Sequence, residues 1–327
     1  MHSSILPSLR KPPLNLSFHI YTANFIILIT SLFQHLASHS LFLQPMLKIA
    51  ASIFIALAFS FCAIAQNEAI VQEGELGISF GGAHYFGDIN NRSAIDKPSP
   101  AVGVYFKKQF GQYIAVRVSG HYAKVGYADE YSNVEFQQRR NLNFSSQIWE
   151  MAVQGDFNFF NFIPGDPSYK FTPYVTLGVG SMNYDPYTFL EGKKYFLRKL
   201  GTEGQGSALF PERKAYRNQA FCFPLGMGIK YNLGKNINLS FEVTYRFTST
   251  DYLDDVSSSY AGITAFPPLG NGNPSPAFLL QDRSYETGSR IGEIGRQRGF
   301  SEQKDQYVIA EIGISISFSS YKCANPK

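Results

Sequence analysis

An unbroken alternation of apolar and polar residues over positions 237–248 constrains the fold of this chain more than any other feature. The odd positions carry Ile, Leu, Phe, Val, Tyr and Phe, and the even positions carry Asn, Ser, Glu, Thr, Arg and Thr. Successive side chains of a β-strand point to opposite faces, so this period of two predicts a strand with one apolar and one polar face. Seven further segments show the pattern, at 76–80, 102–106, 114–122, 149–159, 175–179, 221–231 and 308–318.

The connections between these segments favour a membrane barrel. Short connections at 111–112, 161–170 and 234–236 alternate with long ones at 87–99, 128–141, 186–218 and 251–304. Membrane barrels have short turns on the periplasmic side and long loops outside. We therefore predict an all-β fold: an eight-stranded antiparallel transmembrane β-barrel with short periplasmic turns, long extracellular loops and both termini in the periplasm. A soluble β-sandwich, whose strands also alternate, is the alternative.

Aromatic residues near the ends of the predicted strands support the membrane interpretation. Barrels in membranes carry girdles of aromatic side chains at both interfaces. We expect these girdles to include Tyr113, Phe159, Phe171, Tyr184, Tyr231, Tyr245, Tyr307 and Phe318.

Residues 46–65 have the three parts of a signal peptide. Lys48 supplies a positive start, residues 49–63 are apolar, and Ala63-Ile64-Ala65 forms a small-x-small cleavage site. We predict an N-terminal extension ahead of the true start over residues 1–45, a signal peptide over 46–65 and an outer-membrane β-barrel over 66–327. A membrane anchor over 20–65 is the alternative, although Pro45 and polar residues interrupt it.

The polar faces of the strands carry ionisable residues of both signs. Eight strands enclose an interior just wide enough to be filled by side chains, and buried charges need partners. We predict an interior charge network that plugs the barrel, in which Arg246 compensates inward carboxylates such as Glu242 and Glu311. The predicted members are Arg117, Glu150, Lys230, Glu242, Arg246 and Glu311, with His121 and Asp156 on the same faces. An ion pathway is the alternative, although open channels occur in larger barrels.

Few features favour enzymatic chemistry. Ser119 and His121 share an inward face and could form a nucleophile and base, but a lipid substrate would not reach them in mid-strand. The sequence has no G-x-S-x-G or H-E-x-x-H motif. Its net charge of +4 comes without a concentrated basic run, so no nucleic-acid partner is expected. We predict a protein that is not an enzyme and binds no cofactor.

The long loops are the candidate surfaces for partners. The 251–304 loop begins with Asp251, Tyr252, Asp254 and Asp255, whose carboxylates could bind Ca²⁺. We expect instead no metal, and pairing with Arg290, Arg296 or Arg298 of the same loop. The 186–218 loop has a basic excess that could meet the phosphates of outer-membrane lipid and lipopolysaccharide. Its basic residues are Lys193, Lys194, Arg198, Lys199, Arg213, Lys214 and Arg217.

Three segments carry a family resemblance. Residues 81–89 are GGAHYFGDI, residues 246–260 are RFTSTDYLDDVSSSY, and residues 297–299 are QRG. With these segments the chain resembles the PorG-type outer-membrane β-barrels of Bacteroidetes, which are linked to the type IX secretion system. The resemblance covers nearly all of the chain after the signal peptide. It implies a non-enzymatic role in protein transport, in which the barrel anchors the periplasmic ring of PorK and PorN to the outer membrane. The alternative function is that of a stand-alone surface barrel that binds lipopolysaccharide or another ligand through its long loops.

A ring in the periplasm could touch only the periplasmic parts of the barrel. The 161–170 turn offers the largest such surface, and we expect exposed Phe162 and Ile163 there beside Pro164 and Asp166. The two prolines of this turn hold its shape and so reduce the entropy lost on docking. The alternative is a slightly long turn whose Phe162 anchors in the membrane interface.

The two cysteines after the signal peptide fall at opposite ends of the predicted barrel. Cys222 opens the sixth strand, and Cys323 follows the last strand. A wall of roughly 25 Å separates the two ends, far more than a disulfide spans. We therefore expect both thiols to be free.

Overall fold

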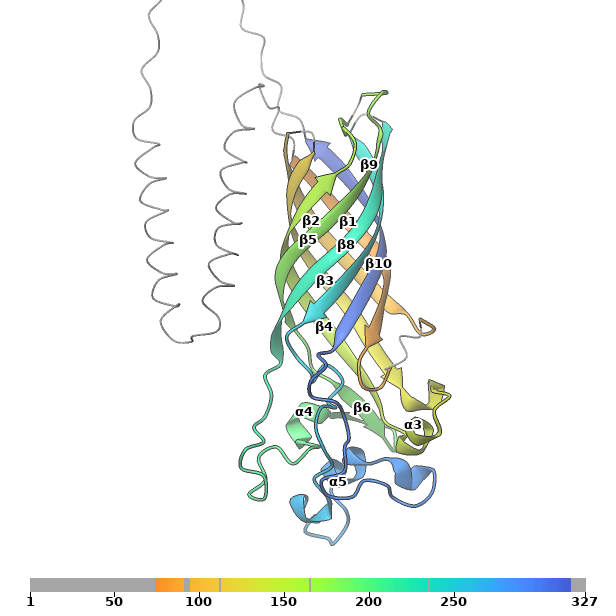
Figure 1. Ribbon diagram of the computed structural model, residues 1–327, viewed down its shortest axis with the longest axis vertical. Coiled ribbons are helices and arrows are strands. Elements are labelled where there is room, and N and C mark those ends of the chain that lie inside the picture. Colours follow the sequence, from red (N-terminus) through yellow and green to blue (C-terminus); the bar gives the residue numbers. More distant parts are fainter. Residues whose placement is uncertain (1–73, 91–94, 112, 165, 235, 319–327) are drawn as a thin grey trace, which may run out of the picture. The chain divides into compact units, whose positions relative to one another are not determined.

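Eight of the strands form a closed antiparallel barrel (Figure 1). The computed structural model describes residues 74–90, 95–111, 113–164, 166–234 and 236–318; the predicted extension, the signal peptide and Cys323 lie outside the described residues. Each strand pairs with the next along the barrel, and β10 pairs with β1 to close the ring. All eight predicted strands are confirmed. They are β1 (Gly74–Phe86), β2 (Ser99–Phe110), β3 (Ile114–Ala128), β4 (Asn143–Asn158), β5 (Phe171–Asn183), β8 (Gln219–Gly234), β9 (Ile237–Thr248) and β10 (Gln306–Phe318).

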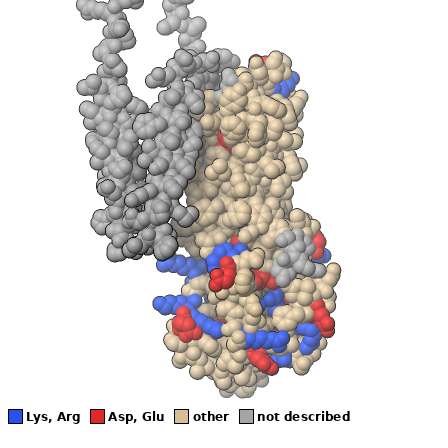
Figure 2. Space-filling model, viewed as in Figure 1, with Lys and Arg blue, Asp and Glu red and all other residues tan. Residues whose placement is uncertain are grey.

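The period of two divides the side chains between the outside and the inside of the barrel. On β9, Ile237 and Phe241 are exposed, whereas Glu242 and Arg246 are buried in the interior. Figure 2 shows the consequence: charged side chains gather at the loop end, and few lie on the wall of the barrel. An apolar outside around a polar inside is the arrangement that a lipid environment favours. The chain is therefore an eight-stranded barrel of the outer-membrane type, and the alternative of a soluble sandwich is wrong.

The two ends of the barrel have different connections, as predicted. The short turns lie at one end, and the helices and remaining strands lie in the long connections at the other (Figure 1). Within the described residues, none of the helices is both long and apolar enough to span a membrane. These smaller elements are η2 (Asp129–Tyr131), α3 (Glu135–Arg140), β6 (Tyr187–Leu190), β7 (Lys193–Phe196), α4 (Leu197–Leu200), η3 (Ile263–Ala265), α5 (Pro276–Gln281) and η4 (Ser284–Glu286).

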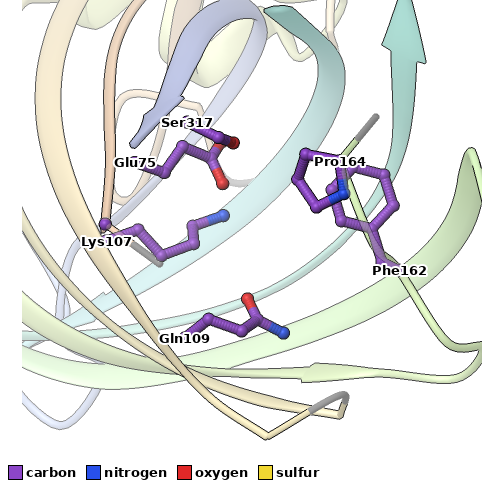
Figure 3. A pocket seen from close by; sticks show the side chains of 7 residues that line it. Glu75, Lys107, Gln109, Phe162, Pro164 and Ser317 are labelled. Atoms are coloured by element: carbon purple, nitrogen blue, oxygen red, sulfur yellow. The ribbon is translucent and has the colours of Figure 1, made fainter. Parts of the chain in front are cut away.

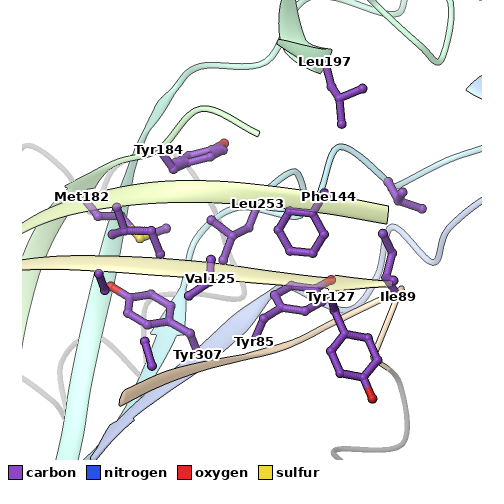
Figure 4. Close-up of a cluster of buried hydrophobic side chains, with 14 of the residues drawn as sticks. Tyr85, Ile89, Val125, Tyr127, Phe144, Met182, Tyr184, Leu197, Leu253 and Tyr307 are labelled. Atoms are coloured by element: carbon purple, nitrogen blue, oxygen red, sulfur yellow. The ribbon is translucent and has the colours of Figure 1, made fainter. Parts of the chain in front are cut away.

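The described residues of the long connections pack together into a structure that we call the loop cap. Its core is a cluster of buried apolar side chains (Figure 4). Leu253 from the last loop and Leu197 from α4 meet Phe144 from β4 and Tyr85 from β1. Burial of such side chains stabilises a fold by about 1.5 to 3 kcal/mol each. The cap is thus an ordered extension of the barrel.

The predicted aromatic girdle is confirmed at five positions and wrong at two. Tyr113, Phe159, Phe171, Tyr231 and Phe318 are exposed on the barrel wall, and Tyr245 is partly buried. Tyr184 and Tyr307 are buried instead. Tyr307 pairs in register with the inward-facing Arg246, so it points into the barrel. The expectation failed because it used only the distance of each residue from a strand end, and not the face of the strand on which the residue lies.

A hairpin within the 186–218 loop was not predicted. Strands β6 and β7 pair with each other, and Tyr187 of β6 pairs with Ser145 of β4. The chain reverses at Glu191 and Gly192, which have φ angles of 51° and 76°. Two central residues with positive φ give the tight turn whose twist suits a two-residue hairpin.

Candidate functional site

The polar interior contains two groups of ion pairs. In the group nearer the short turns, Asp156 Oδ2 lies 2.9 Å from Lys107 Nζ, and Asp156 Oδ1 lies 3.4 Å from Arg117 Nη2. The guanidinium of Arg117 also donates two hydrogen bonds to Glu242, at 2.8 and 3.0 Å. Tyr174 Oη donates a further hydrogen bond of 2.7 Å to Glu242. Arg117 therefore joins carboxylates from β4 and β9 across the barrel, with a bidentate bond on one side.

The second group lies nearer the loop cap and centres on Glu150. Glu150 Oε2 lies 3.1 Å from Arg246 Nε and accepts a hydrogen bond from Tyr307 Oη. His121 stands between two carboxylates: its Nδ1 lies 3.5 Å from Glu150 Oε1, and its Nε2 lies 3.4 Å from Glu311 Oε1. All five side chains are buried.

The interior charge network is therefore present, but the expected partners of Arg246 are wrong. Arg246 pairs with Glu150, whereas Glu242 faces Arg117 and Glu311 faces His121. Residues two or four apart on one strand share a face but are displaced along the barrel. The curvature of the wall instead brings β9 opposite β4, which periodicity along a single strand cannot reveal.

Two inward ionisable residues were missed by the sequence analysis. Lys107 is the closest cationic partner of Asp156, and Glu75 accepts a hydrogen bond of 2.5 Å from Ser315 Oγ. The signal was available, because both residues alternate with outward-facing Leu76 and Phe106. They were missed because the predicted strands were too short at the end that carries the short turns.

Ser119 and His121, the residues considered for nucleophilic chemistry, bind different side chains. Ser119 Oγ donates a hydrogen bond of 3.1 Å to Gln154 Oε1. His121 is held between Glu150 and Glu311. Both side chains are buried within the barrel. A nucleophile needs its base within hydrogen-bond reach, and here each has a different partner.

The three segments of the family resemblance meet in the loop cap. Tyr85 Oη lies 2.5 Å from Asp254 Oδ2 and 3.1 Å from Asp305 Oδ1. Asp88 accepts a hydrogen bond of 3.0 Å from the backbone N–H of Phe300. Gly299 packs so closely that a Cβ there would lie 2.4 Å from Asp88 Oδ2. Residues more than 160 positions apart in sequence thus form one buried cluster.

The carboxylates of the Asp251–Asp255 segment bind groups of the protein itself. Asp251 accepts a hydrogen bond of 2.5 Å from Ser257 Oγ. Asp255 lies 3.7 Å from Arg298 Nη2, so the predicted pairing is confirmed for Arg298. The guanidiniums of Arg290 and Arg296 instead lie over aromatic rings. Among the described residues, no group of three His, Cys, Asp or Glu side chains is arranged to hold a metal.

Burial changes the proton affinity of this segment. Removal from water raises the pKa of Asp255 to about 6 and that of Asp251 to about 7. Burial likewise raises the pKa of Asp254, to which the neighbouring charge of Asp88 adds. Tyr252, whose ring stacks on that of Tyr216 at 4.4 Å, covers one side of the cluster.

Glu203 is a residue of the loop cap whose role no pattern in the sequence predicts. It accepts hydrogen bonds from the backbone N–H groups of Ser257 and Ser258, at 2.9 and 3.0 Å. It also lies 3.1 Å from Arg298 Nη1. Glu203 thereby ties the 186–218 loop to the 251–304 loop. No local pattern marks such a residue, because its partners are more than 50 positions away.

The basic residues of the 186–218 loop divide into two sets. Arg213 donates hydrogen bonds to the backbone oxygens of Glu203 and Ser259, and Arg198 donates one to that of Tyr216. These two arginines hold the cap together. The exposed residues of the set are Lys193, Lys194, Lys199, Lys214 and Arg217.

At the other end of the barrel, the expected exposure of Phe162 is wrong. Its side chain is only 4% exposed, and Lys230 Nζ lies 4.3 Å from the centre of its ring. The turn folds back over the mouth, so that Phe162 and Pro164 line a small pocket with Glu75 and Lys107 (Figure 3). The stabilising contact is a cation–π interaction with a buried lysine. Ile163, Pro164 and Asp166 remain partly exposed.

Solved structures similar to this chain are outer-membrane proteins. Neisserial surface protein A matches with 8% identity and a TM-score of 0.37, covering 75% of this chain and 97% of its own. The attachment invasion locus protein Ail of Yersinia pestis matches with 10% identity and a TM-score of 0.36, covering 76% and 100%. OprG of Pseudomonas aeruginosa matches with 12% identity and a TM-score of 0.32, covering 76% and 98%.

Comparison of the sequence with protein families identifies the family of this chain. No curated protein matches the sequence. The family described as "Domain of unknown function (DUF6089)" matches residues 52–274, which is more than half of the chain and includes seven of the eight barrel strands. The chain therefore belongs to the DUF6089 family.

Proposed function

We propose that this protein is a non-enzymatic structural barrel of the outer membrane. More specifically, we propose that it is a PorG-like component of a type IX secretion system, which anchors the periplasmic PorK and PorN ring to the membrane. In this proposal the loop cap faces outside, and the short turns and both termini face the periplasm.

The observation that carries the proposal is the filled interior. Lys107, Arg117 and Arg246 form ion pairs with buried carboxylates from other strands. Buried ion pairs lock groups in place and are costly to break. A barrel built in this way suits a rigid membrane anchor better than a conduit.

The three segments of the resemblance support the proposal in a second way. Their residues pack against one another inside the loop cap, as the contacts of Tyr85 and Gly299 illustrate. Their role in this chain is to hold the cap together. The surfaces left for a periplasmic partner are then those at the short-turn end. There the proposed docking residues are Ile163, Pro164 and Asp166, with Phe162 as an internal support.

The test is crosslinking at matched positions on the two ends of the barrel. A photo-reactive amino acid replaces Tyr169 in the 161–170 turn or, as the control, Phe300 in the loop cap; both side chains are exposed. We expect crosslinks from position 169 to PorK or PorN in intact cells, and none from position 300. Deleting the gene should abolish type IX secretion. Normal secretion without the barrel, or ring crosslinks from position 300 alone, would contradict the proposal.

A further inference from the structure

The β6–β7 hairpin continues the outer wall of the barrel beyond the membrane. Tyr187 of β6 is paired with Ser145 of β4. Directly paired residues of antiparallel strands point to the same face of the sheet. Ser145 lies an even number of positions before Trp149 and Met151 and so shares their face of β4; these two residues are 63% and 71% exposed on the lipid-facing wall. The side chain of Tyr187 therefore lies on the lipid-facing side, where only 7% of it is exposed.

This outer face of the hairpin combines aromatic rings with lysine. Alternation and the hairpin register place Tyr187, Phe189, Lys194 and Phe196 on it. Lys194 Nζ lies 3.6 Å from the centre of the Tyr187 ring and 4.7 Å from that of Phe196. Lys199 Nζ from α4 lies 5.4 Å from the Phe196 ring. Phe189 is 54% exposed.

The opposite face of the same hairpin points toward the loop cap. It carries Thr188, Leu190, Lys193 and Tyr195 by the same register. Leu190 is buried in the apolar cluster of the cap, and Tyr195 packs against that cluster. Lys193 thus has the same charge as Lys194 and is its neighbour in sequence, but it belongs to the other face.

The hairpin begins just beyond the layer of the lipid headgroups. Trp149 marks the aromatic belt, because the next outward residue on β4 is Gln147, which pairs with Lys124. Ser145 lies four residues beyond Trp149, or about 10 Å along the membrane normal for a tilted strand. The headgroup layer is roughly 5 to 8 Å thick on each side of a bilayer. Flexible lysine side chains can span the remaining distance.

We propose that the outer face of the β6–β7 hairpin binds the phosphate groups of outer-leaflet lipid, with Lys194 and Lys199 as the cationic contacts. The ammonium group of Lys194 lies over the rings of Tyr187 and Phe196, and the exposed ring of Phe189 adds apolar surface beside them. Lipid A, whose phosphates lie at the headgroup level within reach of these lysines, is the partner. The inference rests on the outer-membrane orientation proposed above, and it is independent of the periplasmic ring.

The experiment measures lipid binding to the purified full-length barrel in detergent by native mass spectrometry. The probes are diphosphorylated lipid A, the same lipid without phosphates, and phosphatidylglycerol. We compare the wild type with Lys194→Gln, with Lys199→Gln and with the control Lys193→Gln. At low salt, loss of each contacting lysine should weaken binding of diphosphorylated lipid A about fivefold. Lys193→Gln should change it little, and Lys194→Arg should retain it.

Several results would overturn the proposal. Equal losses for Lys193→Gln and Lys194→Gln would mean that net charge, and not this face, attracts the lipid. Equal binding of the dephosphorylated lipid would exclude phosphate recognition, and equal binding of phosphatidylglycerol would exclude lipid A as the specific partner. Unchanged heat-unfolding transitions show that the variants remain folded. Because ring crosslinking is not measured here, failure of this test leaves the anchor proposal standing.

Discussion

Breaking the ion pair between Arg246 and Glu150 should destabilise the barrel strongly. The Arg246→Met substitution keeps an unbranched stem but removes the guanidinium that lies 3.1 Å from Glu150 Oε2. Removing one partner of a buried pair costs about 3 to 5 kcal/mol. We expect the lower end of this range, about 3 kcal/mol, because Glu150 keeps its contacts to Tyr307 and His121.

A double-mutant cycle separates the ion pair from packing. Urea unfolding of the purified barrel in detergent measures the free energy of unfolding for Arg246→Met, Glu150→Gln and the double variant. If the pair is real, the double variant should lose at least about 1 kcal/mol less than the sum of the single variants. Additive losses, or a loss under about 1 kcal/mol for Arg246→Met, would refute the pairing.

Three further predictions concern the loop cap and the barrel wall. Gly299→Ala should loosen the cap, because its Cβ would lie 2.7 Å from the backbone nitrogen of Ser257; proteinase K should then cut the loops faster while the barrel stays intact. Cys222 is free and buried, so maleimide should label it only after unfolding. Asp251 and Asp255 have pKa values raised to about 7 and about 6 from an ordinary 3.8, so protonation favours the folded cap. The stability of the loop cap should be greatest below about pH 4 and should fall as the pH rises to 7. Hydrogen exchange of the amides of residues 251–260, corrected for intrinsic exchange rates, measures this. Protection that increased with pH would contradict the prediction.

The two mouths of the barrel differ in how well the local sequence predicts their contacts. The apolar Phe162 between polar residues and prolines was interpreted as an exposed docking residue. In the structure its ring covers Lys230, whose position 68 residues later gives no hint of the contact. At the other mouth, the acidic segment at Asp251 was correctly expected to pair with an arginine of its own loop. Its contacts with Thr202 and Tyr216 of another loop were beyond prediction.

The sequence by itself determined the number and order of the barrel strands, most of their lipid-facing residues and most of the ionisable residues of the interior. These features are predictable because the alternation of a strand and the length of a turn depend only on the residues of that segment. The tertiary structure alone decided which charges pair, because partners such as Arg246 and Glu150 come from strands brought opposite each other by the curvature of the wall. It also decided that the β6–β7 hairpin extends this wall, through the single pairing of Tyr187 with Ser145. Such contacts depend on register and closure between distant segments, and no pattern within one segment encodes them.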